Sequence, residues 1–276
     1  MSDGTAADSA VDAVRRTLLH RVAGGAAALA ALATGLARSP RARAAPVEPG
    51  PVSLTLRGGT RVQAALALPA GAGPGAALPM VLLIHEWWGL TDPIRRRAAD
   101  LAGRGYAALA VDLMGGRIAT TPEAARAQMA AVDPARATET LIRWMAWLRA
   151  RPETGARLAT LGWGFGGGWA LAGSLAAPTQ ASVVYYGRVN RPASDFVRLQ
   201  GPVLGHFAER DPFLEPAMVD AFVARMAAAG RALTVYWYDA GHAFANPAGP
   251  TYDAADADRA WERTLSFLAQ TLKAGD

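Results

Sequence analysis

Two short apolar runs most constrain the fold of this chain. They cover Met80–Ile84 and Tyr106–Val111. Runs without polar alternation are typical of strands that are buried on both faces of a parallel sheet. Residues 93–104, which lie between them, have the apolar spacing of a helix that packs on such a sheet. A strand, a helix and a further strand in this order predict an α/β protein.

The alternation of strands and helices continues along the chain. Further strands are predicted at residues 157–161, 181–186, 202–207 and 232–238, and helices at residues 122–131, 134–150, 169–176, 215–229 and 253–272. Val52–Leu56 and Arg61–Leu68 alternate in polarity around a Gly58-Gly59 turn, which predicts an edge hairpin. We therefore expect one α/β domain over residues 50–272, with a mostly parallel central sheet and helices on both faces.

A glycine-rich turn, Gly162-Trp-Gly-Phe-Gly166, joins the predicted strand ending at Leu161 to the helix that follows. This glycine spacing between a strand and a helix is that of the nucleophile elbow, a sharp turn that presents a Ser or Cys at its centre. The flanking glycines are needed because side chains there would collide with neighbouring backbone. In this chain the central residue is Gly164, which brings no nucleophile.

Residues suited to catalysis follow the other predicted strands. In open parallel sheets the binding site lies beyond the carboxyl ends of the strands. Glu86 comes just after the first apolar run, Asp211 comes after the strand at 202–207, and His242 comes after the last strand. The order elbow, Asp and His along the chain is that of the α/β-hydrolase fold.

Several blocks of the sequence carry a more specific likeness. They are His85-Glu-Trp-Trp-Gly-Leu90, Asp112-Leu-Met-Gly-Gly116, Gly162–Gly167, Tyr185-Tyr-Gly187, Pro202–Phe207 with Asp211-Pro-Phe213, and Gly241-His-Ala-Phe-Ala-Asn246. In this order they resemble the dienelactone hydrolase family, over about residues 50–272. The resemblance implies an α/β-hydrolase fold and a carboxymethylenebutenolidase-like activity on esters or lactones. Members of the family use a Cys or sometimes a Ser nucleophile, a His, an Asp, and a Glu that controls the thiol.

The resemblance implies a role for each matching residue. His242 would be the general base and later the general acid, and Asp211 would orient it and stabilise its cationic form. Glu86 would be the carboxylate that faces the nucleophile. Gly164 occupies the position of that nucleophile, so the covalent mechanism of the family fails at its first step.

The same resemblance implies an oxyanion hole, in which the backbone N–H groups of Trp87 and Phe165 would bind the oxyanion. The tryptophans suggest an apolar substrate cleft, lined by Trp88, Trp163 and Asn246, with Trp87 and Trp237 as further candidates, but each tryptophan could equally be a core residue. Members that act on dienelactone hold the substrate carboxylate with arginines, one of them four residues after the His, and here that residue is Asn246. A neutral ester or lactone therefore fits the cleft better than an anionic dienelactone. No cofactor and no metal are expected.

Other assignments stay open. Asp239 is an alternative carboxylate for orienting the base, and each carried-over residue could instead be an ordinary loop residue. His85 and His206 lie next to strand ends and are expected to be structural. Arg117 and Arg126 lie in the region of the family's other substrate-binding arginine, without a clear match.

The glycine at the elbow centre leaves four interpretations. The protein could be an inactive member that binds small molecules without turnover. It could hydrolyse its substrate by direct attack of water, activated by His242 and Asp211. Position 164 could carry a substitution foreign to the natural protein. Finally, a nearby hydroxyl could replace the nucleophile, and Thr160 and Ser174 are the candidates, although neither lies in the elbow itself.

The amino-acid composition limits the classes of molecule that the protein is expected to bind. The chain has no Cys, which excludes disulfides, thiolate metal sites and a cysteine nucleophile. Residues 1–44 hold six Arg and three Asp, so the remainder has 22 basic and 20 acidic residues, and no basic patch interleaved with aromatics. We therefore expect a small-molecule ester or lactone as the partner, and no nucleic acid. The sequence leaves the oligomeric state open, and a monomer is the simpler expectation.

The N-terminus has the pattern of an export signal. Arg15-Arg16-Thr-Leu-Leu19 is followed by a weakly hydrophobic run, Val22–Ala37, and by Ala42-Arg-Ala44. A charged segment, an apolar segment and an A-x-A site form a signal peptide, and the arginine pair resembles a twin-arginine signal. We expect cleavage after Ala44, a periplasmic or secreted protein, and no stable membrane insertion of the mature chain. An uncleaved anchor helix is the alternative, but its glycines and short length argue against a membrane span.

Overall fold

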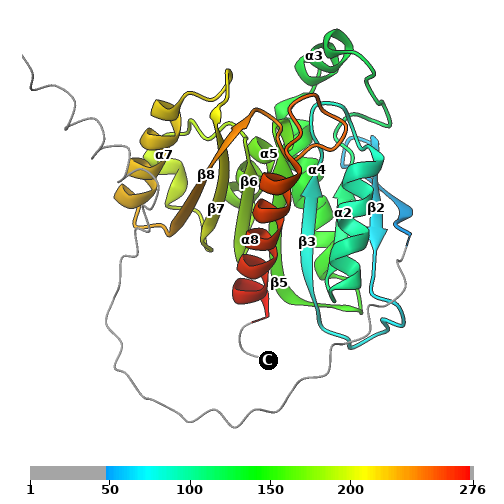
Figure 1. Ribbon diagram of the computed structural model, residues 1–276. Helices are drawn as coiled ribbons and strands as arrows, with labels where there is room; N and C mark the ends of the chain where they lie inside the picture. The colour runs from blue at the N-terminus through cyan, green and yellow to red at the C-terminus, as the bar shows by residue number, and fades with distance from the viewer. Residues whose placement is uncertain (1–47, 274–276) are drawn as a thin grey trace, which may run out of the picture. The chain divides into compact units, whose positions relative to one another are not determined.

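Eight strands form one sheet in the computed structural model, which describes residues 48–273 (Figure 1). The strands are β1 Gly50–Thr55, β2 Arg61–Ala67, β3 Leu78–Ile84, β4 Ala107–Val111, β5 Thr154–Trp163, β6 Ala181–Tyr185, β7 Val203–Arg210 and β8 Leu233–Gly241. Their order in the sheet is β1-β2-β4-β3-β5-β6-β7-β8. β2 pairs antiparallel with β1 and with β4, and all other pairings are parallel. The mostly parallel sheet and its edge hairpin confirm the predicted arrangement.

Helices cover both faces of this sheet. They are α2 Asp92–Gly103, α3 Pro122–Ala130, α4 Pro134–Arg149, α5 Phe165–Ala176, α6 Ala193–Phe196, α7 Pro216–Ala228 and α8 Ala254–Leu272. Figure 1 shows α2 and α8 in front of the sheet and α4 and α5 behind it. α3 projects beyond the sheet, between β4 and α4 in the chain. The α/β-hydrolase architecture expected from the sequence is therefore the one observed.

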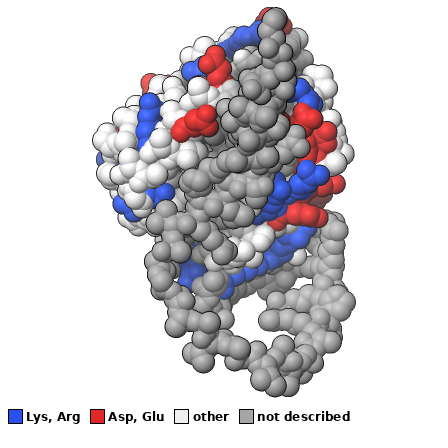
Figure 2. All heavy atoms as spheres, turned by 60° about the vertical axis from the view of Figure 1, so that its left-hand side comes forward, with Lys and Arg blue, Asp and Glu red and all other residues white. Residues whose placement is uncertain are grey.

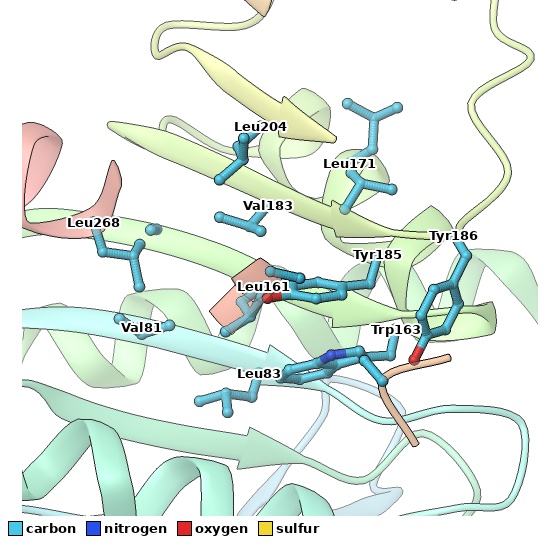
Figure 3. Packing of buried hydrophobic residues seen from close by; sticks show 14 of the residues in the cluster. Val81, Leu83, Leu161, Trp163, Leu171, Val183, Tyr185, Tyr186, Leu204 and Leu268 are labelled. Carbon is cyan, nitrogen blue, oxygen red and sulfur yellow. The ribbon is translucent and has the colours of Figure 1, made fainter. Parts of the chain in front are cut away.

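The central strand β3 shows why its sequence lacks polar alternation. Met80, Leu82 and Ile84 belong to one core cluster, together with apolar side chains of α4. Val81 and Leu83 belong to the cluster on the opposite face, together with side chains of α2 and α8. Figure 3 shows part of this second cluster around Val81 and Leu83. All five side chains are fully buried, and each contributes about 1.5–3 kcal/mol of hydrophobic stabilisation.

The turn between β5 and α5 is tighter than the sequence pattern predicted. The strand was expected to end at Leu161 and the helix to begin at Trp169, whereas β5 runs to Trp163 and α5 begins at Phe165. A single residue, Gly164, makes the turn with φ of 52° and ψ of −114°. The short helix α6 was not predicted, because one helical turn carries no periodic signal.

The predicted export segment at residues 1–44 lies outside the described residues. Within residues 48–273, none of the helices has the length and apolar character that crossing a membrane requires. On the face shown in Figure 2, arginine side chains are interspersed with aspartate and glutamate side chains.

Candidate functional site

The glycines that flank the elbow are enforced by close contact between backbone segments. A Cβ atom on Gly162 would collide with the carbonyl of Gly166. A Cβ atom on Gly166 would in turn collide with the carbonyls of Ile84 and His85, at the end of β3. These contacts confirm the physical reason given for the two flanking glycines. They also press α5 against the end of β3, so the elbow and the loop after β3 form one structure.

Gly164 itself is not crowded. A Cβ atom built on it would meet Nε2 of His242 and the ring of Tyr186 at 3.9 Å, an ordinary van der Waals distance. Its positive φ is a conformation that an L-residue adopts only under strain, as nucleophiles at such turns do. The N–H of Gly164 donates to the carbonyl of Tyr185 at 2.9 Å. A side chain at this position would therefore point at the imidazole of His242.

His242 is held by Asp211 as the chain order predicted. Its Nδ1–H donates to Oδ2 of Asp211 at 2.6 Å. The other carboxylate oxygen, Oδ1, accepts hydrogen bonds from the backbone N–H groups of Phe213 and Leu214. The Asp211 side chain is almost completely buried, whereas that of His242 is 26% exposed. This pairing leaves Nε2 of His242 as the free ring nitrogen facing Gly164, in the geometry of a general base.

Glu86 is buried, so it is not a solvated loop carboxylate. Oε1 accepts a hydrogen bond from the hydroxyl of Tyr186 at 3.2 Å, and Oε2 accepts one from the amide of Asn246. Burial raises the pKa of Glu86 to about 7, although the bond from Tyr186, the charge of His242 and the bond from Asn246 lower it. At neutral pH this carboxyl is therefore present in both its protonated and its ionised form, and strongly shifted pKa values of this kind cluster at functional sites.

No role was predicted for Tyr186 from the sequence, yet it contacts His242 and Glu86 and faces Gly164. Its ring lies edge-on to the His242 imidazole, with the centroids 5.3 Å apart, and its hydroxyl reaches Glu86. Tyr186 has a φ of 35°, which is unusual for a residue other than glycine. Burial and the adjacent Glu86 raise its pKa well above the ordinary value, so the hydroxyl keeps its proton and acts as a donor. Strained backbone of this kind clusters at functional sites, and a sequence does not show it.

The backbone around the predicted oxyanion hole is fixed on both sides. Phe165 is the first residue of α5, where N–H groups have no partner inside the helix. The carbonyl of Trp87 accepts a hydrogen bond from Gln128 of α3 at 2.6 Å. Gly89 N–H donates to the carbonyl of Glu86 at 3.2 Å, which closes the turn that contains Trp87. Within residues 48–273, the N–H of Trp87 makes no backbone hydrogen bond.

The prediction that Trp163 lines a substrate cleft is wrong. Its side chain is 3% exposed and packs in the core against Tyr185 and Trp261, at centroid distances of 5.4 and 6.5 Å (Figure 3). Alternation along β5 explains this, because Trp163 points to the same face as Leu161. Trp88 is partly buried and lies edge-on to the Trp87 ring.

The structure also decides between the alternative residues for orienting His242 and for replacing the nucleophile. Asp239 is exposed and forms an ion pair with Arg210, so it does not orient His242. Thr160 and Ser174 are buried and hydrogen-bonded to each other at 2.8 Å, which removes them as replacement nucleophiles.

Arg117 and Arg126, which lie in the region of the family's other substrate-binding arginine, do not contact Glu86 in the described structure. Arg117 donates to the carbonyl of Met114, and the Arg126 guanidinium lies 5.7 Å over the Trp87 ring.

Both remaining histidines have structural environments. His85 receives a hydrogen bond from the N–H of Leu113 on Nε2, and its Nδ1 lies 2.6 Å from the Glu86 carbonyl. It therefore connects the loops after β3 and β4. His206 contacts the hydroxyls of Tyr238 and Thr264, and burial together with the charge of Arg263 lowers its pKa to about 3. Across residues 48–273, no three His, Asp or Glu side chains are grouped in a way that could hold a metal ion.

The chain is similar to known proteins over most of its described length. The model of the dienelactone hydrolase family matches residues 62–272. Carboxymethylenebutenolidase 1 of Cupriavidus pinatubonensis is 28% identical over 233 residues, covering 79% of this chain and 95% of the relative. The carboxymethylenebutenolidase of Pseudomonas putida is 27% identical over 210 residues, covering 72% of this chain and 89% of the relative.

Solved structures show the same fold. A dienelactone hydrolase-like promiscuous phosphotriesterase from metagenomic libraries superposes with a TM-score of 0.72 and 25% identity, covering 80% of this chain and 98% of the other. An esterase 2 of Thermogutta terrifontis, at 17% identity, superposes with a TM-score of 0.63. From the family match over most of its described length, the chain belongs to the dienelactone hydrolase family.

Proposed function

We propose that this protein hydrolyses small neutral esters or lactones by direct attack of water, without a covalent acyl-enzyme. One observation carries the proposal: Nε2 of His242 lies 3.9 Å from the place where a Cβ of residue 164 would be. A water molecule beside Gly164 is then within reach of a base that Asp211 already orients. The water gives its proton to His242 as its oxygen attacks the acyl carbon. The bond between that carbon and the leaving oxygen then breaks, and His242 returns the proton to the leaving oxygen, which gives the acid and the alcohol.

Backbone N–H groups would stabilise the negative charge that develops on the substrate carbonyl oxygen in this reaction. The N–H groups of Phe165 and Trp87 would face the carbonyl oxygen of the substrate as it becomes an oxyanion. Sites that lose a triad member but keep such donors retain about 10³–10⁴-fold catalysis over water. Activation of the water by His242 would add to this residual level, so the expected activity lies above it and well below that of a covalent member of the family.

Asn246 supports a neutral substrate. It stands four residues after His242, where members that act on dienelactone have an arginine, and it donates to Glu86. An amide carries no positive charge, and Glu86 is partly ionised at neutral pH because its pKa is about 7. An anionic acyl group would therefore meet a carboxylate without a compensating cation from this position, whereas a neutral ester or lactone would not.

The test is p-nitrophenyl acetate hydrolysis by the wild type, His242→Ala and Asp211→Asn. Both variants are expected to fall to the residual level that the oxyanion-binding N–H groups supply alone, and the wild type is expected to show no burst of p-nitrophenol. Asp239→Asn is a matched control, because this exposed aspartate follows β8 but binds Arg210 instead of His242. If the wild type is no faster than His242→Ala, the protein is not a hydrolase of this kind, and an inactive small-molecule binding protein becomes the better interpretation.

We also propose that residues 1–44 direct export by the twin-arginine route, with cleavage after Ala44. Replacing both Arg15 and Arg16 by lysine is expected to keep the protein in the cytoplasm of an expressing cell. Fractionation and N-terminal sequencing of the exported chain would test this directly. A product that begins before residue 44 would contradict the cleavage site.

A further inference from the structure

We propose that the site also transfers the acyl group of its ester directly to an alcohol that carries an apolar group. This inference rests on the proposed water attack, because the same base and the same space beside Gly164 would serve both nucleophiles. In a covalent member of the family the nucleophile side chain fills that space. Here it is bounded by His242 and the ring of Tyr186, with no atom nearer than 3.9 Å to a Cβ on Gly164.

An aromatic side chain beside His242 favours an organic acceptor over water. The ring of Phe213 lies edge-on to the imidazole, with the centroids 5.0 Å apart. Phe213 is nevertheless 62% exposed, which is unusual for a large apolar side chain next to a catalytic base. An alcohol whose hydroxyl reaches Nε2 of His242 would bring its apolar body within contact of this ring and cover it. Water makes no such contact.

The backbone of Phe213 explains why the ring stays at this place. Its N–H donates to Oδ1 of Asp211 at 2.8 Å, while Oδ2 of the same carboxylate holds His242. The ring and the base are therefore positioned by one buried side chain. Removing the ring leaves this backbone bond intact, so the ring can be tested separately from the base.

The transfer step balances without any further reactant. The alcohol gives its proton to Nε2 of His242 as its oxygen bonds to the acyl carbon, and the carbonyl oxygen becomes an oxyanion facing the N–H groups of Trp87 and Phe165. The bond between the acyl carbon and the original leaving oxygen then breaks. His242 returns the proton to that oxygen, and the products are the new ester and the original alcohol.

The experiment uses the purified full-length chain, p-nitrophenyl acetate and benzyl alcohol as the acceptor, with methanol for comparison. Benzyl acetate and acetate are quantified by chromatography, and p-nitrophenol is followed by absorbance. Benzyl alcohol is expected to increase the rate of p-nitrophenol release and to yield more ester per mole of acceptor than methanol. Phe213→Ala is expected to lower the benzyl acetate to acetate ratio about three- to tenfold, and this ratio cancels any change in rate that the variant causes in both reactions alike.

Val197→Ala, which removes another exposed apolar side chain, is the control and is expected to leave the ratio unchanged. Hydrolysis that depends on His242 without benzyl acetate above the buffer background would overturn the transfer and leave the proposed function standing. Loss of both reactions would overturn both. Benzyl acetate formation that does not respond to Phe213→Ala would contradict the placement of the acceptor on this ring.

Discussion

Replacing Gly164 by serine is expected to restore covalent catalysis and to destabilise the fold at the same time. The Cβ of the new residue would lie 3.9 Å from Nε2 of His242, in ordinary contact. An Oγ about 1.4 Å further along a suitable rotamer comes within roughly 2.6–3.2 Å of the imidazole, the distance at which a base activates a nucleophile. Nothing in the site needs to move for this triad to form.

The stability cost follows from the backbone. Residue 164 has a φ of 52° and a ψ of −114°, which only glycine adopts without strain. An L-residue held in such a conformation costs about 1–3 kcal/mol of unfolding free energy. Gly164→Ala carries the same strain without a hydroxyl, so the serine and alanine variants are expected to have nearly equal unfolding free energies in urea, both below that of the wild type.

The activity assay separates the two effects. Gly164→Ser is expected to hydrolyse p-nitrophenyl acetate at least about 10²-fold faster than Gly164→Ala, with a burst and covalent labelling by a fluorophosphonate. A cysteine variant is expected to behave likewise and to be alkylated by iodoacetamide. Equal rates for the serine and alanine variants, with no labelling, would refute the assignment of the turn as a nucleophile elbow.

Three further predictions concern the surroundings of the site. The Glu86 carboxyl binds its proton more tightly in the folded state, with a pKa of about 7 against 4.5, so its contribution to stability is complete below pH 4.5 and is lost as the pH rises through 7. In urea, the unfolding free energy of the wild type is expected to be up to about 3 kcal/mol lower at about pH 8 than at about pH 5, whereas Glu86→Gln is expected to lack this decrease. The same decrease in Glu86→Gln as in the wild type would contradict the burial of the charge. Gly166→Ala is expected to lower the unfolding free energy by at least about 3 kcal/mol, because the new Cβ would collide with the carbonyl of Ile84. Gly58→Ala is the control: its Cβ would lie in open space, so the unfolding free energy is expected to change by only about 0.5 kcal/mol. Trp163→Ala is expected to lower the unfolding free energy by about 3–5 kcal/mol and to leave the KM for p-nitrophenyl acetate unchanged, because the side chain is buried in the core. A raised KM would indicate that Trp163 lines the substrate cleft after all.

The parts of the site that depend on backbone topology could be predicted from the sequence. Asp211 and His242 follow parallel strands, and parallel strands bring their carboxyl ends to one edge of the sheet. The order of these strands and the elbow, together with the family resemblance, therefore predicted a pairing that the structure shows at 2.6 Å, although Asp239 remained an alternative to Asp211. The apolar run at β3 likewise predicted burial on both faces.

The parts that depend on the direction of side chains could not be predicted so well. Trp163 was predicted to line the cleft as one of several tryptophans, but alternation along β5 turns it into the core. Tyr186 and Phe213 lie in blocks that carry the family resemblance, but no role was predicted for either side chain. The contact of Tyr186 with His242 depends on a positive φ at Tyr186, and the contact of Phe213 depends on the hydrogen bond from its N–H to Asp211. Neither feature has a sequence pattern of its own.

The edge hairpin has a practical consequence for handling this protein. The turn at Gly58 and Gly59 is exposed, and a Cβ on either residue would meet no other atom. β1 and β2 occupy one end of the strand order, whereas the elbow, Asp211 and His242 follow β5, β7 and β8 toward the other end. A surface linker, an affinity tag or new chain termini introduced at this turn would therefore be separated from the site by the intervening strands. Because Ala64 pairs with Val111 at the end of β4, the turn lies at the same carboxyl-end edge of the sheet as the candidate site, so immobilisation through the hairpin would turn that edge toward the support.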